Sequence, residues 1–430
     1  MKKLGIKKET KSIWEGRVPL NPQSVETLIK NGYEVYVESS NIRIYKDEEY
    51  KKVGAIITDD ISHCDFIIGV KEIKMDELIP DKPQLFFSHT IKGQDYNMHL
   101  LQYILDNNVT LFDYEKIIDD EGRRLVFFGK FAGIAGMVDS LYGVGQRLKQ
   151  HYDIETPFMN IKQSYQYDSI IVAKESIKKA GEEITKNGLP KDIAPFVIFL
   201  MGYGNVAEGC RDILNELPIE EIDPDDLSKL DKNFNNHKIY LATFKEKHMI
   251  ERKDGSEFDL QHYFHNGEAY KSKLGKYLPY ASMYMNAIFW AAEYPVFLDK
   301  SELLNLQKQG KLQMIGDVTC DIEGSIKATV KSTEPDNPIY IYDAENGKIT
   351  DGFKGDGIPD CAIDHLPCEF PKESSDAFSN VLMPFIEKIL DADFSKSIDK
   401  SELPNEIKKS CIAHQGKLEK DFLYLEEFLK

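Results

Sequence analysis

The sequence has few cysteines, and none of them belongs to a recognisable motif. Six cysteines are scattered along 430 residues, with no CxxC pair among them. Neither a disulfide framework nor a zinc site is indicated, and no metal-ligand set is predicted. The distribution is typical of a protein from a reducing cytosol or an organelle matrix, and we expect a cytoplasmic location.

Long apolar runs are also absent. No segment approaches the roughly 18 apolar residues that a membrane span requires. The nearest approach, residues 281–292, is interpreted as a buried helix. The basic residues in Met1–Glu9 are not followed by the apolar stretch of a secretory signal. We therefore expect no cleaved signal and no membrane partner.

Positive charge is scarce. The 54 Lys and Arg residues face 72 Asp and Glu residues, which gives a formal net charge of −18. This excess of acid argues against nucleic acid and anionic membrane surfaces as partners. An anionic ligand would have to be held by a local cluster of positive charge.

The remaining composition describes a soluble globular protein, with 42% apolar and 29% charged residues. A chain of 430 residues is too long for one ordinary core, so we expect two or three domains. Short apolar runs alternate with helical patterns in the first third, which favours a mostly parallel sheet covered by helices. The expected strands there are 4–6, 34–37, 64–70, 84–87 and 110–113, and a helix is expected over 24–30.

Other segments give weaker signals. Residues 131–147 predict a long helix with small residues at its start, which fits either a crossing between domains or close helix packing within one domain. Residues 228–277 are polar and are interpreted as a strand-poor insertion. The charged tail that ends at residue 430 has a helical pattern, as has 374–389.

A glycine turn near the middle of the chain is the most informative local pattern. The apolar run from Val197 ends at Gly202, Gly204 follows, and Asn205 and Val206 begin a segment with helical pattern. Gly202 allows a tight turn, Gly204 lets a pyrophosphate approach the backbone, and the N–H groups at the start of the helix favour phosphate. The pattern predicts a dinucleotide site, with an ordinary glycine turn as the alternative.

An acidic residue about 20 positions after such a turn commonly meets the ribose hydroxyls. Glu221 and Asp223 lie there, which favours NAD because an acid repels a 2′-phosphate. Lys229 and Lys232 are nearby, however, so the predicted cofactor is NAD or NADP.

Lys71 and His89 each follow an apolar run that is expected to be a buried strand. The carboxyl ends of neighbouring parallel strands share one crevice, so these side chains could act together. The proton affinity of a lysine can be tuned by burial, and histidine exchanges a proton near neutral pH. The alternative is that either one is a surface residue.

Arg17 and Arg124 lie in expected loops of an acidic protein and are candidates for binding carboxylates. Glu115 follows the strand that ends at Asp113 and could bind an amine. The alternative for each is a solvated residue.

Several segments together resemble the alanine dehydrogenase and transhydrogenase superfamily, and within it the lysine–ketoglutarate reductases. The general resemblance is carried by 4–10 and 14–22. The narrower one is carried by Phe-Ser-His-Thr-Ile-Lys at 87–92, Asp-Tyr-Glu-Lys at 113–116, Gly-Arg-Arg at 122–124, Phe-Ala-Gly-Ile-Ala-Gly-Met at 131–137, Gly-Tyr-Gly-Asn-Val at 202–206 and Ile-Asp-His-Leu-Pro at 363–367.

The resemblance implies an NAD(P)-dependent oxidoreductase that condenses L-lysine with 2-oxoglutarate and reduces the imine to saccharopine, or runs the reverse. Lys71 and His89 match the acid–base pair of the family, Arg17 and Arg124 match arginines that hold carboxylates, and Glu115 matches an acid near the lysine amine. Nucleotide-binding positions match Asp321 and Asp364, and the animal and plant reductases are associated with NADPH. The oligomeric state is left open, a homo-oligomer included.

We therefore predict an α/β fold of two Rossmann-like, doubly wound parallel-sheet domains with a cleft between them. The substrate domain is expected at 1–135 and 385–430, and the NAD(P)-binding domain at 136–384. The second dehydrogenase domain of the bifunctional relatives is not expected in this chain. Two alternatives are an alanine dehydrogenase-like amino-acid dehydrogenase and a catalytically silent binding protein of the same fold.

Overall fold

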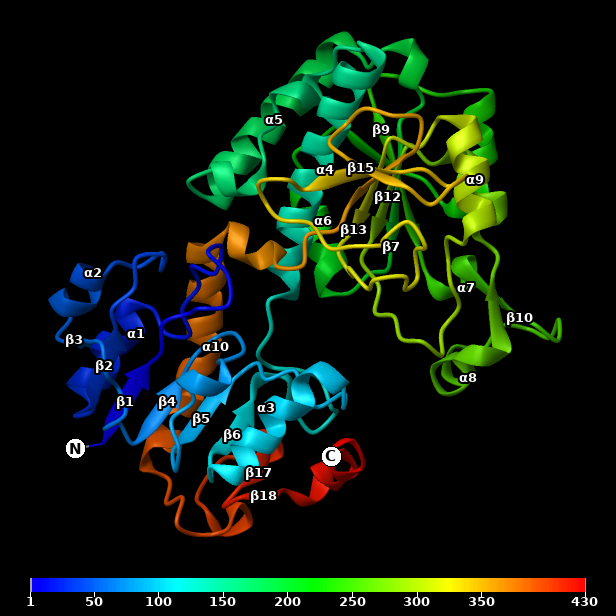
Figure 1. Ribbon diagram of the computed structural model, residues 1–430. Helices are drawn as coiled ribbons and strands as arrows, with labels where there is room; N and C mark the ends of the chain where they lie inside the picture. The colour runs from blue at the N-terminus through cyan, green and yellow to red at the C-terminus, as the bar shows by residue number, and fades with distance from the viewer. Residues whose placement is uncertain (1, 430) are drawn as a thin grey trace. The chain divides into compact units, whose positions relative to one another are not determined.

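The computed structural model describes residues 2–429, and these divide into two compact units (Figure 1). The first unit contains residues 2–128 and 371–429, and the second contains residues 129–370. The second unit thus begins and ends earlier in the chain than the predicted domain of 136–384. Each unit contains a mostly parallel eight-stranded sheet with helices, so the predicted α/β fold is confirmed.

The first unit is built on a sheet with the strand order β18-β17-β6-β5-β4-β1-β2-β3. Its strands are β1 (Lys3–Ile6), β2 (Glu34–Glu38), β3 (Ile56–Thr58), β4 (Phe66–Ile68), β5 (Pro83–Phe86), β6 (Thr110–Asp113), β17 (Cys411–His414) and β18 (Lys417–Leu418). Its helices are α1 (Pro22–Lys30), α2 (Asp47–Lys52), α3 (Asp95–Asp106), α10 (Pro371–Asp391) and α11 (Asn405–Ser410). The five strands expected in the first third of the chain are all present.

The prediction of a helical C-terminal tail was wrong for its central part. Strand β17 pairs antiparallel with β6 and extends the first sheet, and β18 pairs antiparallel with β17. All four residues of β17 are buried. So short an apolar run, set in a strongly charged tail, carries too weak a period to be told from a helix by sequence.

The second unit contains a sheet with the order β15-β14-β16-β13-β12-β7-β9-β8 and a separate β10-β11 hairpin. Its strands are β7 (Val197–Met201), β8 (Ile219–Glu221), β9 (Ile239–Phe244), β10 (Ile250–Arg252), β11 (Tyr270–Ser272), β12 (Met283–Asn286), β13 (Met314–Asp317), β14 (Ile339–Tyr342), β15 (Ile349–Asp351) and β16 (Ile358–Cys361). Its helices are α4 (Gly129–Tyr152), α5 (Ile170–Asn187), α6 (Asn205–Leu214), α7 (Glu246–Met249), α8 (Leu260–His265) and α9 (Lys300–Gln309).

Strand β7 lies in the interior of this sheet and is buried on both faces. Ile198 and Leu200 belong to one apolar cluster, whereas Val197, Phe199 and Met201 belong to another. Such a continuous apolar run is typical of a parallel strand covered on both sides by other elements.

Two predictions for the second unit were wrong. Residues 228–277, interpreted as a strand-poor insertion, contain β9, which pairs in parallel with β7. The polar segments on either side masked this short strand. Residues 281–292, interpreted as a buried helix, contain β12 instead, which pairs in parallel with β7 and β13. A short apolar run is compatible with a buried strand and with a buried helix. Here, pairing with the two neighbouring strands makes it a strand.

The small residues at the start of α4 allow close helix packing inside the second unit. A Cβ at Gly133 would clash with the carbonyl oxygen of Val206 in α6, and a Cβ at Gly209 of α6 would clash with that of Lys130. Helices α4 and α6 therefore meet backbone to backbone. Of the two readings of these glycines, packing within one unit is confirmed.

None of the helices within residues 2–429 combines the length and the apolar character that crossing a membrane demands.

Candidate active site

Three predicted site residues follow three neighbouring parallel strands of the first sheet. Strand β5 pairs in parallel with β4 on one side and with β6 on the other. Lys71 follows β4, His89 follows β5, and Glu115 follows β6. Loops at the carboxyl ends of adjacent parallel strands can act on one ligand, so these three side chains are placed for a common task.

The residue directly after Lys71 contacts His89. Nδ1 of His89 lies 3.6 Å from a carboxylate oxygen of Glu72, and Nζ of Lys11 lies 3.4 Å from the same oxygen. The interaction with His89 is the main cause that lowers the pKa of Glu72. Sequence reasoning missed Glu72, although its place beside Lys71 at a strand end was the available signal.

His89 has an unusual backbone conformation, with φ at 55°. Such left-handed values are uncommon outside glycine and need support from the surroundings. The carboxylate of Asp113 accepts hydrogen bonds from the N–H and the hydroxyl of Ser88, and the amide of Asn97 donates to the His89 carbonyl. The ring of Phe87 stacks on the imidazole at 6.3 Å between centroids. These contacts fix the ring's position.

Glu115 and Arg124 form an ion pair at 3.3 Å. Oε2 of Glu115 is buried and has no hydrogen-bond partner among the described residues. A buried carboxylate oxygen without a donor is costly unless a ligand supplies one. Glu115 therefore offers an acceptor for an amine.

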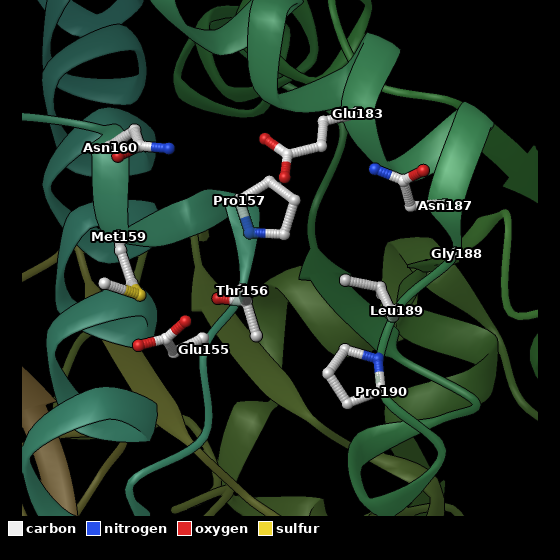
Figure 2. Close-up of a pocket in the computed structure, with 10 residues that line it drawn as sticks. All are labelled: Glu155, Thr156, Pro157, Met159, Asn160, Glu183, Asn187, Gly188, Leu189 and Pro190. Carbon is white, nitrogen blue, oxygen red and sulfur yellow. The ribbon is translucent and has the colours of Figure 1, made fainter.

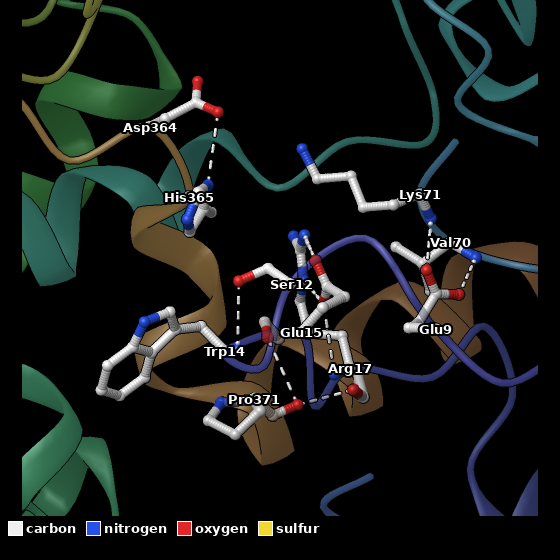
Figure 3. A network of polar contacts seen from close by, with 12 residues as sticks. Glu9, Ser12, Trp14, Glu15, Arg17, Val70, Lys71, Asp364, His365 and Pro371 are labelled. Atoms are coloured by element: carbon white, nitrogen blue, oxygen red, sulfur yellow. Dashed lines mark hydrogen bonds and ion pairs between the residues drawn. The ribbon is translucent and has the colours of Figure 1, made fainter. Parts of the chain in front are cut away.

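Arg17 is buried and is not a solvated loop residue. Its Nε and Nη2 donate to the two carboxylate oxygens of Glu15 at 2.7 and 2.6 Å (Figure 3). The guanidinium also lies 4.2 Å from the centroid of the Phe128 ring. The hydroxyl of Ser375 in α10 accepts the N–H of Val18 and anchors this loop. The guanidinium is therefore held in one orientation in which a carboxylate already binds to it.

The glycine turn of the second unit has the geometry that the sequence predicts. Gly202 has a φ of 96°, and its N–H donates to the carbonyl of Phe244 at 3.0 Å. Gly204 precedes α6, which begins with Asn205 and Val206, and a Cβ at Gly204 would meet no atom within 4 Å. The amino end of α6 is thus open to a phosphate, which its N–H groups and dipole attract.

The acidic residues expected to meet the ribose lie one strand away from this turn. Glu221 is the last residue of β8, Asp223 follows this strand, and β9 lies between β8 and β7. Nη1 of Arg211 lies 2.5 Å from the Glu221 carboxylate. The side chain of Asp223 accepts the N–H of Asp225 in the following turn. The strand next to β7 ends at Phe244, so Lys245 occupies the place where an acid was expected.

Lys245, Lys247 and His248 are among the residues that line a cavity of about 290 Å³ beside this strand end. Nδ1 of the buried His248 accepts the N–H of Lys245 at 3.2 Å, and its Nε2 has no partner among the described residues. Burial lowers the pKa of His248, which favours the neutral ring. With Nδ1 accepting, the neutral ring carries its proton on Nε2. The cavity is therefore lined by two lysines and an unused donor, and also by the acidic Glu221 and Asp223.

Asp223, Asp225 and His248 also place possible metal-ligand atoms within 4.8 Å of one another. The Asp225 carboxylate accepts the hydroxyl of Tyr277 at 2.5 Å, however, and Lys276 lies 3.4 Å away. A protonated Nε2 cannot bind a metal ion. These contacts favour a hydrogen-bonding site over a metal site.

The other two predicted nucleotide residues follow neighbouring parallel strands of the second sheet. Asp321 comes after β13 and Asp364 after β16, and these strands pair in parallel. The Asp364 carboxylate lies 3.3 Å from Nδ1 of His365, whose Nε2 lies 3.2 Å from Glu334. These contacts, chiefly the one with Asp364, raise the pKa of His365.

A cavity of about 510 Å³ in the second unit is lined by none of the predicted residues (Figure 2). Its walls come from the segment after α4 and from the end of α5. They include the carboxylates of Glu155 and Glu183. Cavity size alone would thus have led away from the residues that carry chemistry.

Comparison with known proteins shows what the chain is similar to. Residues 5–135 match the family model of the alanine dehydrogenase/PNT N-terminal domain. The chain is 36% identical to alpha-aminoadipic semialdehyde synthase of Arabidopsis thaliana and 34% identical to the mitochondrial protein of that name from Bos taurus, over 99% of this chain in both cases. It is 27% identical to saccharopine dehydrogenase [NAD(+), L-lysine-forming] of Yarrowia lipolytica, over 89% of this chain and 90% of that protein.

The chain is thus similar over most of its length to proteins named as semialdehyde synthases and as saccharopine dehydrogenases. It spans only 41% and 47% of the length of the two semialdehyde synthases that it matches. Among solved structures, an L-alanine dehydrogenase superposes with a TM-score of 0.63 at 16% identity, covering 100% of both chains. A transhydrogenase from Sinorhizobium meliloti gives 0.53 at 14% identity, covering 97% of this chain and 98% of the other. These two structures share the fold of this chain.

Proposed function

We propose that this protein is an NAD(P)-dependent, L-lysine-forming saccharopine dehydrogenase. It condenses L-lysine with 2-oxoglutarate and reduces the product to saccharopine, and it catalyses the reverse. The observation that carries the proposal is the placement of Lys71, His89 and Glu115 after three adjacent parallel strands. The names of the relatives identify the reaction to which these side chains are suited.

Lys71 and His89 are the proposed acid–base residues. The ε-amine of lysine adds to the ketone carbon, and the resulting carbinolamine loses water to form an imine. A base must take a proton from the nitrogen, and an acid must protonate the departing oxygen. A lysine and a histidine on neighbouring loops can fill both roles, and Glu72 fixes the orientation of the imidazole.

Charged side chains of the first unit are proposed to hold the substrates. Arg17 and Arg124 bind carboxylates, since a guanidinium pairs with them through two parallel hydrogen bonds. Glu115, whose Oε2 has no donor among the described residues, accepts the amine of lysine. When substrate is absent, Glu15 pairs with Arg17 in place of the substrate carboxylate.

A nicotinamide dinucleotide is the proposed cofactor, and it supplies the hydride that reduces the imine carbon. Gly202 and Gly204 give the pyrophosphate access to the backbone, and Asn205 and Val206 contribute the first turn of α6. Asp321, Asp364 and Asp223 are proposed to lie near the nucleotide. The open space at Gly204 supports this assignment, because a bound phosphate needs that approach.

The lysines beside the turn are the argument for NADP over NAD. The acidic residues that argued for NAD lie at and after the end of β8, which does not pair with β7, and they line the same cavity as the lysines. Lys245 stands after the adjacent strand, and Lys247 and the Nε2 proton of His248 face the same cavity. A dianionic 2′-phosphate is suited to such cationic and donor groups. We therefore propose that NADPH is preferred.

The decisive assay follows reduced-nucleotide absorbance in four mixtures. L-lysine plus 2-oxoglutarate is compared with pyruvate plus ammonia, each with NADPH and with NADH. We expect oxidation only with lysine and 2-oxoglutarate, and faster with NADPH. Activity with pyruvate and ammonia would identify an alanine dehydrogenase-like enzyme, and no activity in any mixture would favour a silent binding protein.

A further inference from the structure

The main chain that carries Lys71 is held by a carboxylate from another part of the sheet. After β4, the N–H groups of Val70 and Lys71 donate to the two carboxylate oxygens of Glu9, at 2.7 and 3.0 Å (Figure 3). Glu9 comes from the loop after β1, the strand that pairs with β4. One side chain therefore satisfies two consecutive backbone donors.

Two further bonds complete the support of this short segment. The hydroxyl of the buried Tyr114 donates to the carbonyl of Gly69 at 2.8 Å, and the N–H of Phe87 donates to the carbonyl of Val70 at 3.0 Å. Residues 69–71 are thus bonded through both their donors and their acceptors. Hydrogen bonds to an ionised carboxylate are stronger than those between neutral groups. When Glu9 is ionised, its two bonds are therefore stronger than the bonds to the carbonyls of Gly69 and Val70.

We propose that Glu9 is a positioning residue, which fixes the backbone from which Lys71 acts. This inference rests on the proposed acid–base role of Lys71. A general acid or base works within about 2.6–3.2 Å of the atom that it serves. Displacement of its backbone by even about 1 Å lowers the rate by up to about a hundredfold. Glu9 acts through Lys71 and needs no contact with substrate.

The protonation of Glu9 gives this role a pH signature. Burial and the neighbouring Glu15 raise the pKa of Glu9 to about 8, whereas Arg17 and the two backbone N–H groups act in the opposite direction. Tyr114 is the other titratable neighbour. The ionised carboxylate accepts a hydrogen bond from each of the two N–H groups, one at each oxygen. In the protonated form one oxygen carries a proton and is a donor, so its bond to the N–H group is weakened. Glu9→Gln reproduces the protonated form.

A double-mutant cycle separates positioning from simple stabilisation. Above a pH of about 8, where Glu9 of the wild type is ionised, Glu9→Gln should lower kcat by at least about tenfold while KM for lysine changes little. The loss should grow as pH rises through about 8, where wild-type Glu9 ionises. In the Lys71→Met background the same change should have no further effect on the remaining rate. Equal losses in both backgrounds would overturn the proposal.

Glu38→Gln is the matched control. The carboxylate of Glu38 also accepts a backbone N–H, that of Lys8 at 2.9 Å, and it pairs with Nζ of Lys7 at 3.1 Å. It makes no bond to the Lys71 segment. We expect Glu38→Gln to lower the unfolding midpoint, and any loss of rate that it causes should be the same with and without Lys71.

Amide hydrogen exchange tests the same contact without relying on turnover. At a pH above about 8, the peptide that contains Val70 and Lys71 should exchange at least about tenfold faster in Glu9→Gln than in the wild type, because a bond to the ionised carboxylate is lost. Glu38→Gln should leave that peptide unchanged. Unchanged exchange in Glu9→Gln would overturn the proposal. A wild-type protein inactive with lysine and 2-oxoglutarate would refute the proposed function, and faster exchange in Glu9→Gln would still support the positioning of residue 71.

Discussion

Among the single residues of the first unit, hydrogen bonds and ion pairs hold the charged side chains of the proposed site in place. Arg17 is held by Glu15, His89 by Glu72, and Lys71 by the contacts of its own backbone. Holding an acid–base group in place before substrate arrives removes the cost of ordering it during the reaction. Figure 3 shows this for Arg17 with Glu15 and for the backbone of Lys71 with Glu9.

Loss of either proposed acid–base residue should slow the reaction much more than it weakens nucleotide binding. Lys71→Met and His89→Gln are each expected to lower kcat by about 10²–10⁴-fold, the usual contribution of a general acid or base. Binding of NADPH, measured by fluorescence titration, should stay unchanged because the glycine turn lies in the other unit. Lys74→Met, a change at an exposed lysine nearby, is the control. Normal rates in both variants would refute the assignment.

Buried acids in the second unit should make its stability depend on pH. Burial and the neighbouring Asp317 raise the pKa of Asp360 from 3.8 to about 8. Between these two values the folded protein holds a proton that the unfolded chain releases, so stability should fall as pH rises, by at most about 1.4 kcal/mol per pH unit. Urea denaturation at several pH values across this window measures the slope.

Asp360→Asn removes this titration and should flatten the slope. Hydrogen bonds to Asp360 from the hydroxyls of Thr329 and Tyr340 can be accepted by the amide oxygen of the variant. The exposed Asp336→Asn is the control and should leave the slope as it is. A wild-type stability that rises with pH through this window would contradict the assignment.

At the scale of elements, β9 has the largest consequence for function. It is inserted between β7 and β8, so Lys245 follows the strand next to β7 and lines one cavity together with Glu221 and Asp223. The hydroxyl of Tyr203 in the turn bonds to Glu246 at 3.1 Å, and Nζ of Lys245 lies 5.7 Å from the centroid of the Tyr203 ring. Strand order, which spacing along the chain does not reveal, thus places lysines beside the acidic residues that were expected near the turn.

Lys245→Ala should change the choice between the two nucleotides. We expect the affinity for NADPH to fall by about 10–100-fold, the value of a charge-assisted hydrogen bond, while the affinity for NADH is little changed. Lys238→Ala alters a lysine just before β9, at the opposite end of the strand, and should affect neither. Equal losses for both nucleotides in Lys245→Ala would show that this residue does not select a 2′-phosphate.

The sequence predicted the elements with strong local signals and missed those decided by the sheet. Apolar runs and turn residues made several elements recognisable. These include the strands at 110–113 and 339–342 and the glycine turn at Gly202. Strands β9 and β12 were missed, since short runs acquire their strand character from parallel neighbours. Glu9 and Glu72 were missed for a related reason: only the fold shows which backbone or ring a carboxylate meets.

At the scale of the whole molecule, the proposed tasks divide between the two units. All five proposed catalytic and substrate-binding residues belong to the first unit, and the glycine turn belongs to the second. The proposed reaction therefore uses residues of both units. Because the chain spans less than half the length of the semialdehyde synthases that it matches, its own reaction has to be measured on this chain.

The most direct measurement follows the hydride itself. The protein is incubated with L-lysine, 2-oxoglutarate and NADPH that carries deuterium at the transferable position of the nicotinamide, and the product is analysed by mass spectrometry. We expect saccharopine with one deuterium on the carbon that was the ketone of 2-oxoglutarate. We also expect Lys71→Met to form this product much more slowly. Absence of saccharopine, or saccharopine without deuterium, would contradict the proposed function.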